Sequence, residues 1–183
     1  MPAPRDSIVL AAQRFLGPLA SLPMSDQLSK EEEKHLARAV ELAQEARDGG
    51  NHPFGALLVR DDGTVLEARN GVVTTPDVTA HAELSAIRDA SRSGWTFEQF
   101  KSATLYTSTE PCAMCSGALY WAGVRRVVFA LSEAGLYVHT GTDHEHVLRM
   151  PAEQVFAAGK ADTVVRGPFL DEAANKVHAG FWQ

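Results

Sequence analysis

The chain contains few cysteines and no long apolar run. Only two of its 183 residues are cysteines, Cys112 and Cys115. No thiol is left over for a disulfide framework, so we expect a reducing, cytoplasmic setting, where a Cys-x-x-Cys pair binds metal or reacts. The apolar stretch over residues 8–22 is interrupted by Arg14 and Pro18. It therefore fits neither a signal peptide nor a membrane-spanning helix, which needs roughly 20 apolar residues.

Positive charge is also scarce. Lys and Arg total 17 against 23 Asp and Glu, which gives a formal net charge of −6. Proteins that bind nucleic acid usually present a basic face, whereas the only adjacent basic residues here are Arg125 and Arg126. The charge balance therefore favours a small, neutral substrate and predicts neither nucleic acid nor a membrane as a partner.

Proline separates the beginning of the chain from the rest. Four prolines fall within the first 24 residues, which predicts an N-terminal extension over residues 1–24. The remaining residues, 25–183, are enough to bury a hydrophobic core, and we expect them to form one domain.

Hydrophobic periodicity and turn residues predict a hairpin followed by alternating helices and strands. Ser29 and Glu32 form a capping box before an apolar helical repeat, and Asp61-Asp62-Gly63 predicts the hairpin turn. Residues 133–150 carry no clear signal. We expect helices over residues 29–48, 81–91, 112–121, 151–158 and 170–181, and strands over residues 54–59, 64–69, 103–108, 126–130 and 163–166. This order is typical of an α/β protein, a three-layer α-β-α sandwich with a mixed sheet.

The strongest chemical signal is a motif in two parts. Its first part is His81-Ala82-Glu83 and its second is Pro111-Cys112-Ala113-Met114-Cys115, with 28 residues between Glu83 and Cys112. Residues three apart on a helix share a face, so both cysteines can bind one ion together with His81. Three protein ligands leave the fourth position of a tetrahedral zinc open, as in catalytic sites. We therefore expect His81, Cys112 and Cys115 to bind one Zn²⁺ per chain, rather than the cysteines forming a redox pair or a closed structural site.

The carboxylate of Glu83 completes the motif without being a ligand. On one regular helix His81 and Glu83 would point roughly 200° apart. They can face one site only if His81 lies at or just before the first turn. Zinc lowers the pKa of water to about 7, and Glu83 can take a proton from that water and deliver protons to a ring nitrogen and to departing ammonia. The motif order H-x-E, then P-C-x-x-C, is typical of zinc deaminases acting on nucleobases.

These residues resemble the cytidine deaminase superfamily over about residues 36–128. The wider strings Pro53-Phe54-Gly55-Ala56 and Thr79-Ala80-His81-Ala82-Glu83 also resemble this family. Within it, the chain is most similar to the branch of guanine deaminases, yeast-type cytosine deaminase and tRNA adenosine deaminase. The resemblance implies a mixed five-stranded sheet between helices, a tightly bound zinc and a homodimer.

The resemblance also implies substrate contacts. Asn70 matches an asparagine that hydrogen-bonds the base, although Asn70-Gly71 also fits an ordinary turn pair. Phe54 matches a residue that lines the pocket. The backbone N–H of Ala82 and the backbone carbonyl of Glu110 match groups that hold the edges of the base.

Two further segments remain open to interpretation. Phe181 and Trp182 lie at the end of the last expected helix. In related enzymes such aromatics close over the pocket, so we count Trp182 as a substrate contact; simple packing of a terminal helix is the alternative. The run Asp143-His144-Glu145-His146 resembles a metal cluster, but we expect a solvated loop.

Together these features predict zinc-dependent hydrolytic deamination of a free nucleobase or a similar small aminated heterocycle. Guanine comes first, with cytosine-like or triazine bases next. The alternatives are a nucleoside deaminase, a tRNA adenosine deaminase, which requires a basic groove, and a zinc-stabilised binding module without catalysis.

Overall fold

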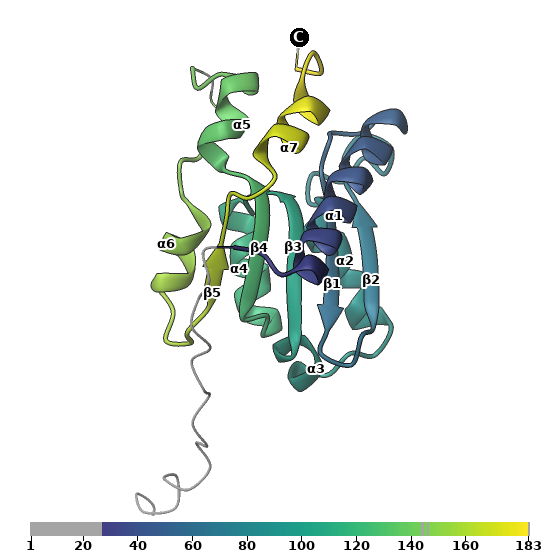
Figure 1. Ribbon diagram of the computed structural model, residues 1–183, viewed down its shortest axis with the longest axis vertical. Helices are drawn as coiled ribbons and strands as arrows, with labels where there is room; N and C mark the ends of the chain where they lie inside the picture. The colour runs from purple at the N-terminus through teal and green to yellow at the C-terminus, as the bar shows by residue number, and fades with distance from the viewer. Residues whose placement is uncertain (1–26, 144, 146, 183) are drawn as a thin grey trace, which may run out of the picture.

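The computed structural model describes residues 27–143, 145 and 147–182, and these residues fold around one five-stranded sheet (Figure 1). In chain order the elements are α1 (Lys30–Asp48), β1 (Gly55–Arg60), β2 (Val65–Arg69), α2 (Ala82–Arg92), α3 (Phe97–Lys101), β3 (Ala103–Thr109), α4 (Ala113–Ala122), β4 (Arg126–Leu131), α5 (Glu133–Thr140), α6 (Ala152–Ala157), β5 (Val164–Arg166) and α7 (Asp171–His178). The extension predicted over residues 1–24 lies outside the described residues.

The sheet is mixed, as predicted. Its strand order is β2-β1-β3-β4-β5. The hairpin strands β1 and β2 are antiparallel, β1 also pairs antiparallel with β3, and β3, β4 and β5 are parallel. The carboxyl ends of β3 and β4 therefore lie at the same edge of the sheet, where the loops that carry Cys112 and α5 begin.

Helices cover both faces of the sheet and confirm the three-layer sandwich. Leu57 of β1 packs in the core shared with α1 and α7, whereas its neighbours Ala56 and Leu58 pack in the core shared with α2, α4 and α6. This alternation follows from the two-residue period of a strand. In Figure 1, α1 lies in front of the sheet, and α2 and α4 lie behind it.

The helix α1 is held close to the sheet. The predicted capping box is confirmed: the Ser29 hydroxyl accepts from the Glu32 N–H at 3.2 Å, and the Glu32 carboxylate accepts from the Ser29 N–H at 2.8 Å. At the start of β1, a Cβ on Gly55 would lie 2.4 Å from the Ala39 carbonyl oxygen and 2.5 Å from Leu42 Cβ. Only glycine allows this approach, which fixes the position of the adjacent Phe54.

The structure differs from the sequence prediction in three places. The helix α5 lies within residues 133–150, for which the sequence predicts no element. None of its residues is buried, so it has no apolar stripe from which a helix could be predicted. The helix α3 is five residues long and begins with a capping box at Thr96, too short to show periodicity. The last helix was predicted to reach residue 181 but ends at His178, so Phe181 and Trp182 lie beyond it.

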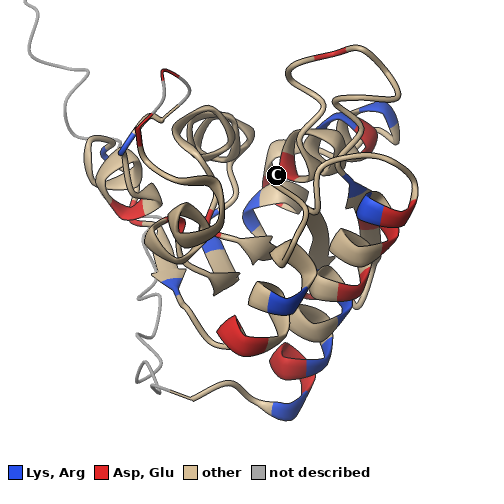
Figure 2. Cartoon of the chain, turned by 90° about the horizontal axis from the view of Figure 1, so that it is seen from above, with Lys and Arg blue, Asp and Glu red and all other residues tan. Residues whose placement is uncertain are grey.

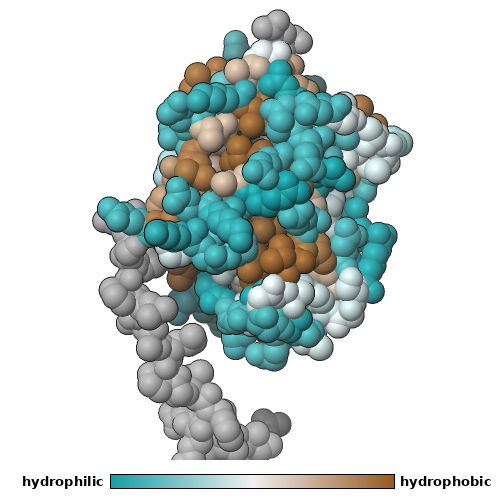
Figure 3. Space-filling view, turned by 45° about the vertical axis from the view of Figure 1, so that its right-hand side comes forward, coloured by the Kyte–Doolittle hydropathy of each residue, from teal (hydrophilic) through white to brown (hydrophobic). Residues whose placement is uncertain are grey.

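Charge and hydrophobicity are both mixed over the surface. Among the described residues, no helix is long and apolar enough to cross a membrane. Figure 2 shows Lys and Arg interspersed with Asp and Glu along the helices. On the face shown in Figure 3, hydrophobic residues are exposed in several patches that are separated by hydrophilic ones. In Figure 2, therefore, neither sign of charge is confined to one part of the chain.

Candidate active site

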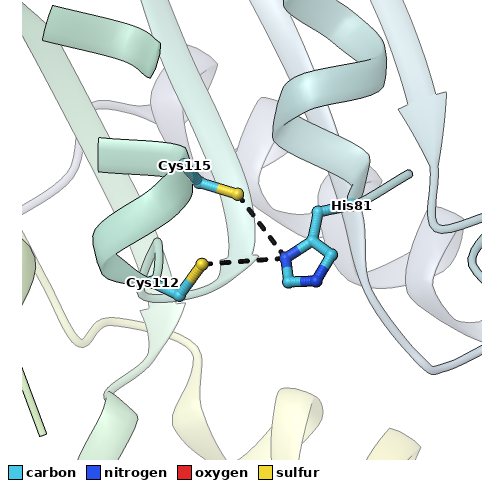
Figure 4. Close-up of side chains that lie close together, drawn as sticks. All are labelled: His81, Cys112 and Cys115. Carbon is cyan, nitrogen blue, oxygen red and sulfur yellow. Dashed lines mark hydrogen bonds between the residues drawn. The ribbon is translucent and has the colours of Figure 1, made fainter. Parts of the chain in front are cut away.

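Three donor atoms predicted as metal ligands lie together. The Nδ1 atom of His81 is 3.7 Å from Cys112 Sγ and 3.6 Å from Cys115 Sγ (Figure 4). All three donor atoms lie within 4.8 Å of one another. Among the described residues, this is the only group of three or more His, Cys, Asp and Glu side chains close enough to hold one ion.

The donor spacing fits zinc. Bonds of about 2.3 Å to sulfur and 2.0–2.1 Å to nitrogen, at a tetrahedral angle, place the donor atoms about 3.5 Å apart. The distances from His81 to the two cysteines match this value. His81, Cys112 and Cys115 form a candidate zinc site with three protein ligands, and a tetrahedral ion held by them keeps one position for a water or a substrate.

Two helix starts position the ligands. His81 is the N-cap of α2 and has an extended backbone, with φ −64° and ψ 153°. Cys112 is the N-cap of α4, with φ −63° and ψ 170°, and Cys115 lies in the first turn of that helix. Helix N-termini carry partial positive charge, which favours the thiolate forms that zinc requires.

Glu83 is buried beside the ligands. It lies in the first turn of α2 and is 6% exposed. Because His81 precedes the helix rather than belonging to it, the two side chains reach the same site, as the sequence argument required. Burial raises the pKa of Glu83 to about 7, and the negative charge of Cys112 acts in the same direction. A carboxyl group with such a pKa suits proton transfer near neutral pH.

The two thiols differ in acidity. Hydrogen bonding from Cys115 and from His81 lowers the pKa of Cys112 to about 4, against the opposing effect of burial. The bond to Cys112, together with burial, raises the pKa of Cys115. Cys112 is therefore the first of the pair to become a thiolate, and its hydrogen bond raises the pKa of His81.

Asn70 lies at the end of β2 and is tied to the ligand loop. The neighbouring Gly71 N–H donates to the Ala80 carbonyl at 2.8 Å, one residue before His81. The Asn70 Oδ1 atom accepts from the Val72 N–H at 3.1 Å. Its Nδ2 atom is buried and has no hydrogen-bond partner among the described residues. A buried donor without a partner is costly, so this atom is suited to a ligand acceptor.

Glu110 has a structural role that the sequence did not reveal. Its carboxylate accepts from the Glu133 N–H and from the Ala152 N–H, both at 2.9 Å. These N–H groups belong to the first residues of α5 and α6. Both carboxylate oxygens thus bind the first N–H groups of two helices. Only the backbone carbonyl of Glu110 remains for the predicted contact with a base. A cavity of about 460 Å³ lies beside Glu110, and Tyr137 and Arg149 also line it.

Aromatic side chains from the loop before β1 and from the C-terminal segment contact one another. The Phe54 ring lies 6.0 Å from Trp182 and 5.3 Å from His178 between ring centroids. His52 lies 5.3 Å from Trp182, and the charge of nearby His81 contributes, after burial, to a lowered pKa of His52. Trp182 is therefore connected to the ligand His81 through His52. Sequence reasoning missed His52 and His178, and the only signal for His178 was its place four residues before Trp182.

The sequence of the chain matches a family model described as the cytidine and deoxycytidylate deaminase zinc-binding region, over residues 29–131. A Schizosaccharomyces pombe protein described as a probable cytosine deaminase is 38% identical over 159 residues, which are 86% of this chain and 96% of that protein. A guanine deaminase of Bacillus subtilis is 46% identical over 99 residues, which are 54% of this chain and 63% of that protein.

The fold has counterparts among solved structures. A guanine deaminase from Nitrosomonas europaea superimposes with a TM-score of 0.68 at 28% sequence identity. The superposition covers 82% of this chain and 84% of that chain. The candidate zinc ligands and Glu83 all fall within the residues that the family model matches.

Proposed function

The chain belongs to the family of cytidine and deoxycytidylate deaminases with a zinc-binding region, and from that premise we propose that it deaminates a free nucleobase or a similar small aminated heterocycle. The reaction consumes water, replaces an exocyclic amine by a carbonyl and releases ammonia. Guanine is the first candidate, and cytosine-like and triazine bases come next.

One observation carries this proposal: a buried carboxyl group that is not a ligand lies beside three zinc donors. A structural zinc site has no need of Glu83, whose burial raises its pKa to about 7. Retaining a buried ionisable group is costly unless it is used. The pairing of Glu83 with an incomplete ligand set is therefore best explained by catalysis.

The mechanism follows from the residues. When bound, zinc supplies water with a pKa lowered toward 7 as the nucleophile. Glu83 removes a first proton from that nucleophile as it attacks the carbon bearing the amine, and later removes a second proton from the hydroxyl left on that carbon as the carbonyl forms. The same carboxyl group delivers the first proton to the ring nitrogen and the second to the amine, which leaves as ammonia, so it acts as both base and acid. His81, Cys112 and Cys115 hold the ion and take no proton.

The substrate is held by groups around the ligands. Asn70 Nδ2 donates to a carbonyl or ring nitrogen of the base, which satisfies a buried donor that otherwise has no partner among the described residues. The backbone N–H of Ala82 and the backbone carbonyl of Glu110 bind the other edges. Phe54 and Trp182 pack against the ring, as expected for a flat aromatic substrate.

The distribution of charge favours a small base over tRNA. The basic side chains on the described surface mostly pair with acids, as Arg38 does with Glu45 and Glu67 at 2.8 Å. Lys and Arg are interspersed with Asp and Glu in Figure 2. Binding of a polynucleotide requires basic side chains that are free to contact phosphates, so a tRNA adenosine deaminase is the weaker candidate.

Assembly is a separate part of the proposal. The resemblance to the family implies a homodimer that works without nucleic acid or membrane partners. Light scattering on the zinc-loaded protein should give twice the chain mass, and a monomer mass would contradict it.

A panel of substrates tests the function. Ammonia release is measured with guanine, cytosine, adenine, their nucleosides, aminotriazines and a tRNA anticodon stem-loop, and Glu83→Gln serves as the blank. Release from free bases that vanishes in the variant is the expected result. Release from the stem-loop alone, or from nucleosides alone, would overturn the proposed substrate class.

A further inference from the structure

His178 is a buried histidine for which the proposed chemistry has no use. It is the last residue of α7 and is 1% exposed. Both ring nitrogens are occupied: Nδ1 accepts from the Trp182 indole N–H at 3.2 Å, and Nε2 lies 3.3 Å from Thr109 Oγ1. The ring thus connects the C-terminal segment to the last residue of β3.

The indole fixes the tautomer of this ring. Trp Nε1 can only donate a hydrogen bond, so Nδ1 of His178 must be the acceptor. A neutral ring then carries its proton on Nε2 and donates it to the Thr109 hydroxyl. Neutral His178 satisfies both contacts at once, whereas a protonated ring has no acceptor left for Trp182.

The surroundings keep the ring neutral. Arg47 comes from α1 and His139 from α5, and both lie near enough to affect the pKa of His178. Burial first, then His139 and Arg47, lowers the pKa of His178 to about 4. His139 Nε2 donates a hydrogen bond to Asn175 Oδ1 at 2.7 Å, and His52 faces Trp182 from the loop before β1.

Trp182 depends on this contact for its position. The helix α7 ends at His178, and the chain then turns at Gly180, which has φ 69°. Helical backbone bonds therefore do not hold the indole. Its ring is stacked on His178 at an interplanar angle of 14°, with the centroids 6.1 Å apart. Phe54 and His52 contact the Trp182 ring, and His52 lies near enough to His81 for its pKa to be affected by the charge of that ligand.

We propose that His178 is a positioning residue that fixes the indole of Trp182 beside Phe54 by tethering it to Thr109 at the end of β3. The next residues along the chain, Glu110 to Cys112, form the loop that supplies a zinc ligand, so one imidazole connects the aromatic residues Phe54 and Trp182 to the edge of the sheet that carries the metal site. The inference rests on the proposed function in one respect, that Trp182 contacts the substrate.

Two substitutions separate tethering from packing. His178→Asn retains an oxygen near the position of Nδ1 and can still accept from Trp182, whereas His178→Phe fills the volume without an acceptor. In a Trp95→Phe, Trp121→Phe background, Trp182 is the only tryptophan. Acrylamide quenching of its fluorescence at pH 7 should rise most in H178F, which has no acceptor, and less in H178N, which keeps the acceptor for Trp182 but is too short to reach Thr109. Equal quenching in H178F and the parent would overturn the proposal.

Kinetics provide the second readout. Loss of one hydrogen bond should raise KM for the substrate about fivefold in H178F, with kcat less affected and a smaller rise of KM in H178N. A parallel loss of kcat in both variants would indicate a structural role alone and would overturn the proposal.

Thr109→Val provides a near-isosteric variant if H178F does not fold. It removes the other partner of His178 and should raise quenching of Trp182 without changing zinc content; unchanged quenching in Thr109→Val would contradict the tether. The fluorescence measurement needs no turnover. Failure to find a substrate would therefore overturn the proposed function, whereas the tether is tested by quenching alone.

Discussion

His81 and Cys112 occupy the same position in two different helices. Each is an N-cap with an extended backbone, His81 for α2 and Cys112 for α4. Their donor atoms lie 3.7 Å apart although 31 positions separate them in sequence. The ligand set is thus built from two converging helix starts, whose partial positive charge favours anionic ligands.

Removing one sulfur should remove the metal. Cys115→Ser replaces a thiolate by a hydroxyl, which is a poor zinc ligand, so we expect zinc content to fall from about one ion per chain to near zero. Metal analysis of the purified protein measures this directly. Met114→Ala, at the exposed position between the cysteines, is the matched control and should retain zinc. Equimolar zinc in C115S would show that the ion binds elsewhere.

Asn70 should contribute to substrate binding through Nδ2. Asn70→Asp keeps an acceptor for the Val72 N–H but loses the buried donor. We expect kcat/KM to fall about 10- to 100-fold, the usual cost of losing one buried hydrogen bond to a ligand. Zinc content should stay at the wild-type level. An unchanged kcat/KM would mean that Asn70-Gly71 is only a turn.

Glu110 should act as a structural bridge. Glu110→Gln keeps one acceptor oxygen and loses the other, so either α5 or α6 loses the partner of its first N–H. We expect the free energy of unfolding to fall by about 1–3 kcal/mol, measured by urea denaturation. Glu153→Gln, an exposed change in the first turn of α6, should shift it by less than about 0.5 kcal/mol. Equal effects of the two substitutions would argue against the bridge.

The sequence predicted those parts of the molecule that depend on local signals. The strands, the capping box at Ser29 and the ligand triad follow from periodicity and spacing, because each involves residues close in sequence or a known motif. The helix α5 could not be predicted, since its support comes partly from Glu110, which lies 23 positions before Glu133.

The cluster of His52, Phe54, His178 and Trp182 could not be predicted for the same reason. His178 contacts Thr109 across 69 positions, and nothing in the local sequence pairs them. The end of α7 was misplaced for a related reason: the apolar residues Phe181 and Trp182 continue the hydrophobic pattern, but they are half-buried by tertiary contacts with Phe54 and His52 rather than by a helix.

Burial of His178 should make stability fall in mild acid. Its pKa is lowered from 6.5 to about 4 in the native state. Between these values the unfolded chain binds a proton that the native state does not, so the free energy of unfolding decreases as the pH falls.

The size of this effect can be isolated with His178→Asn, which does not titrate. The stability difference between wild type and H178N should change by about 2 kcal/mol between pH 7 and pH 5, to the disadvantage of wild type. Urea denaturation at both pH values measures it, and other titrating groups cancel in the difference. A difference that does not vary with pH would show that His178 titrates normally in the native state.

The most direct test of the central claim compares wild type with Glu83→Gln, in zinc content and in ammonia release from free bases. If Glu83 is the proton carrier beside a catalytic zinc, the variant retains one zinc per chain and its native thermal unfolding but loses turnover. If the chain were a zinc-stabilised binding module, wild type would release no ammonia and the substitution would change nothing, and that result would contradict the account.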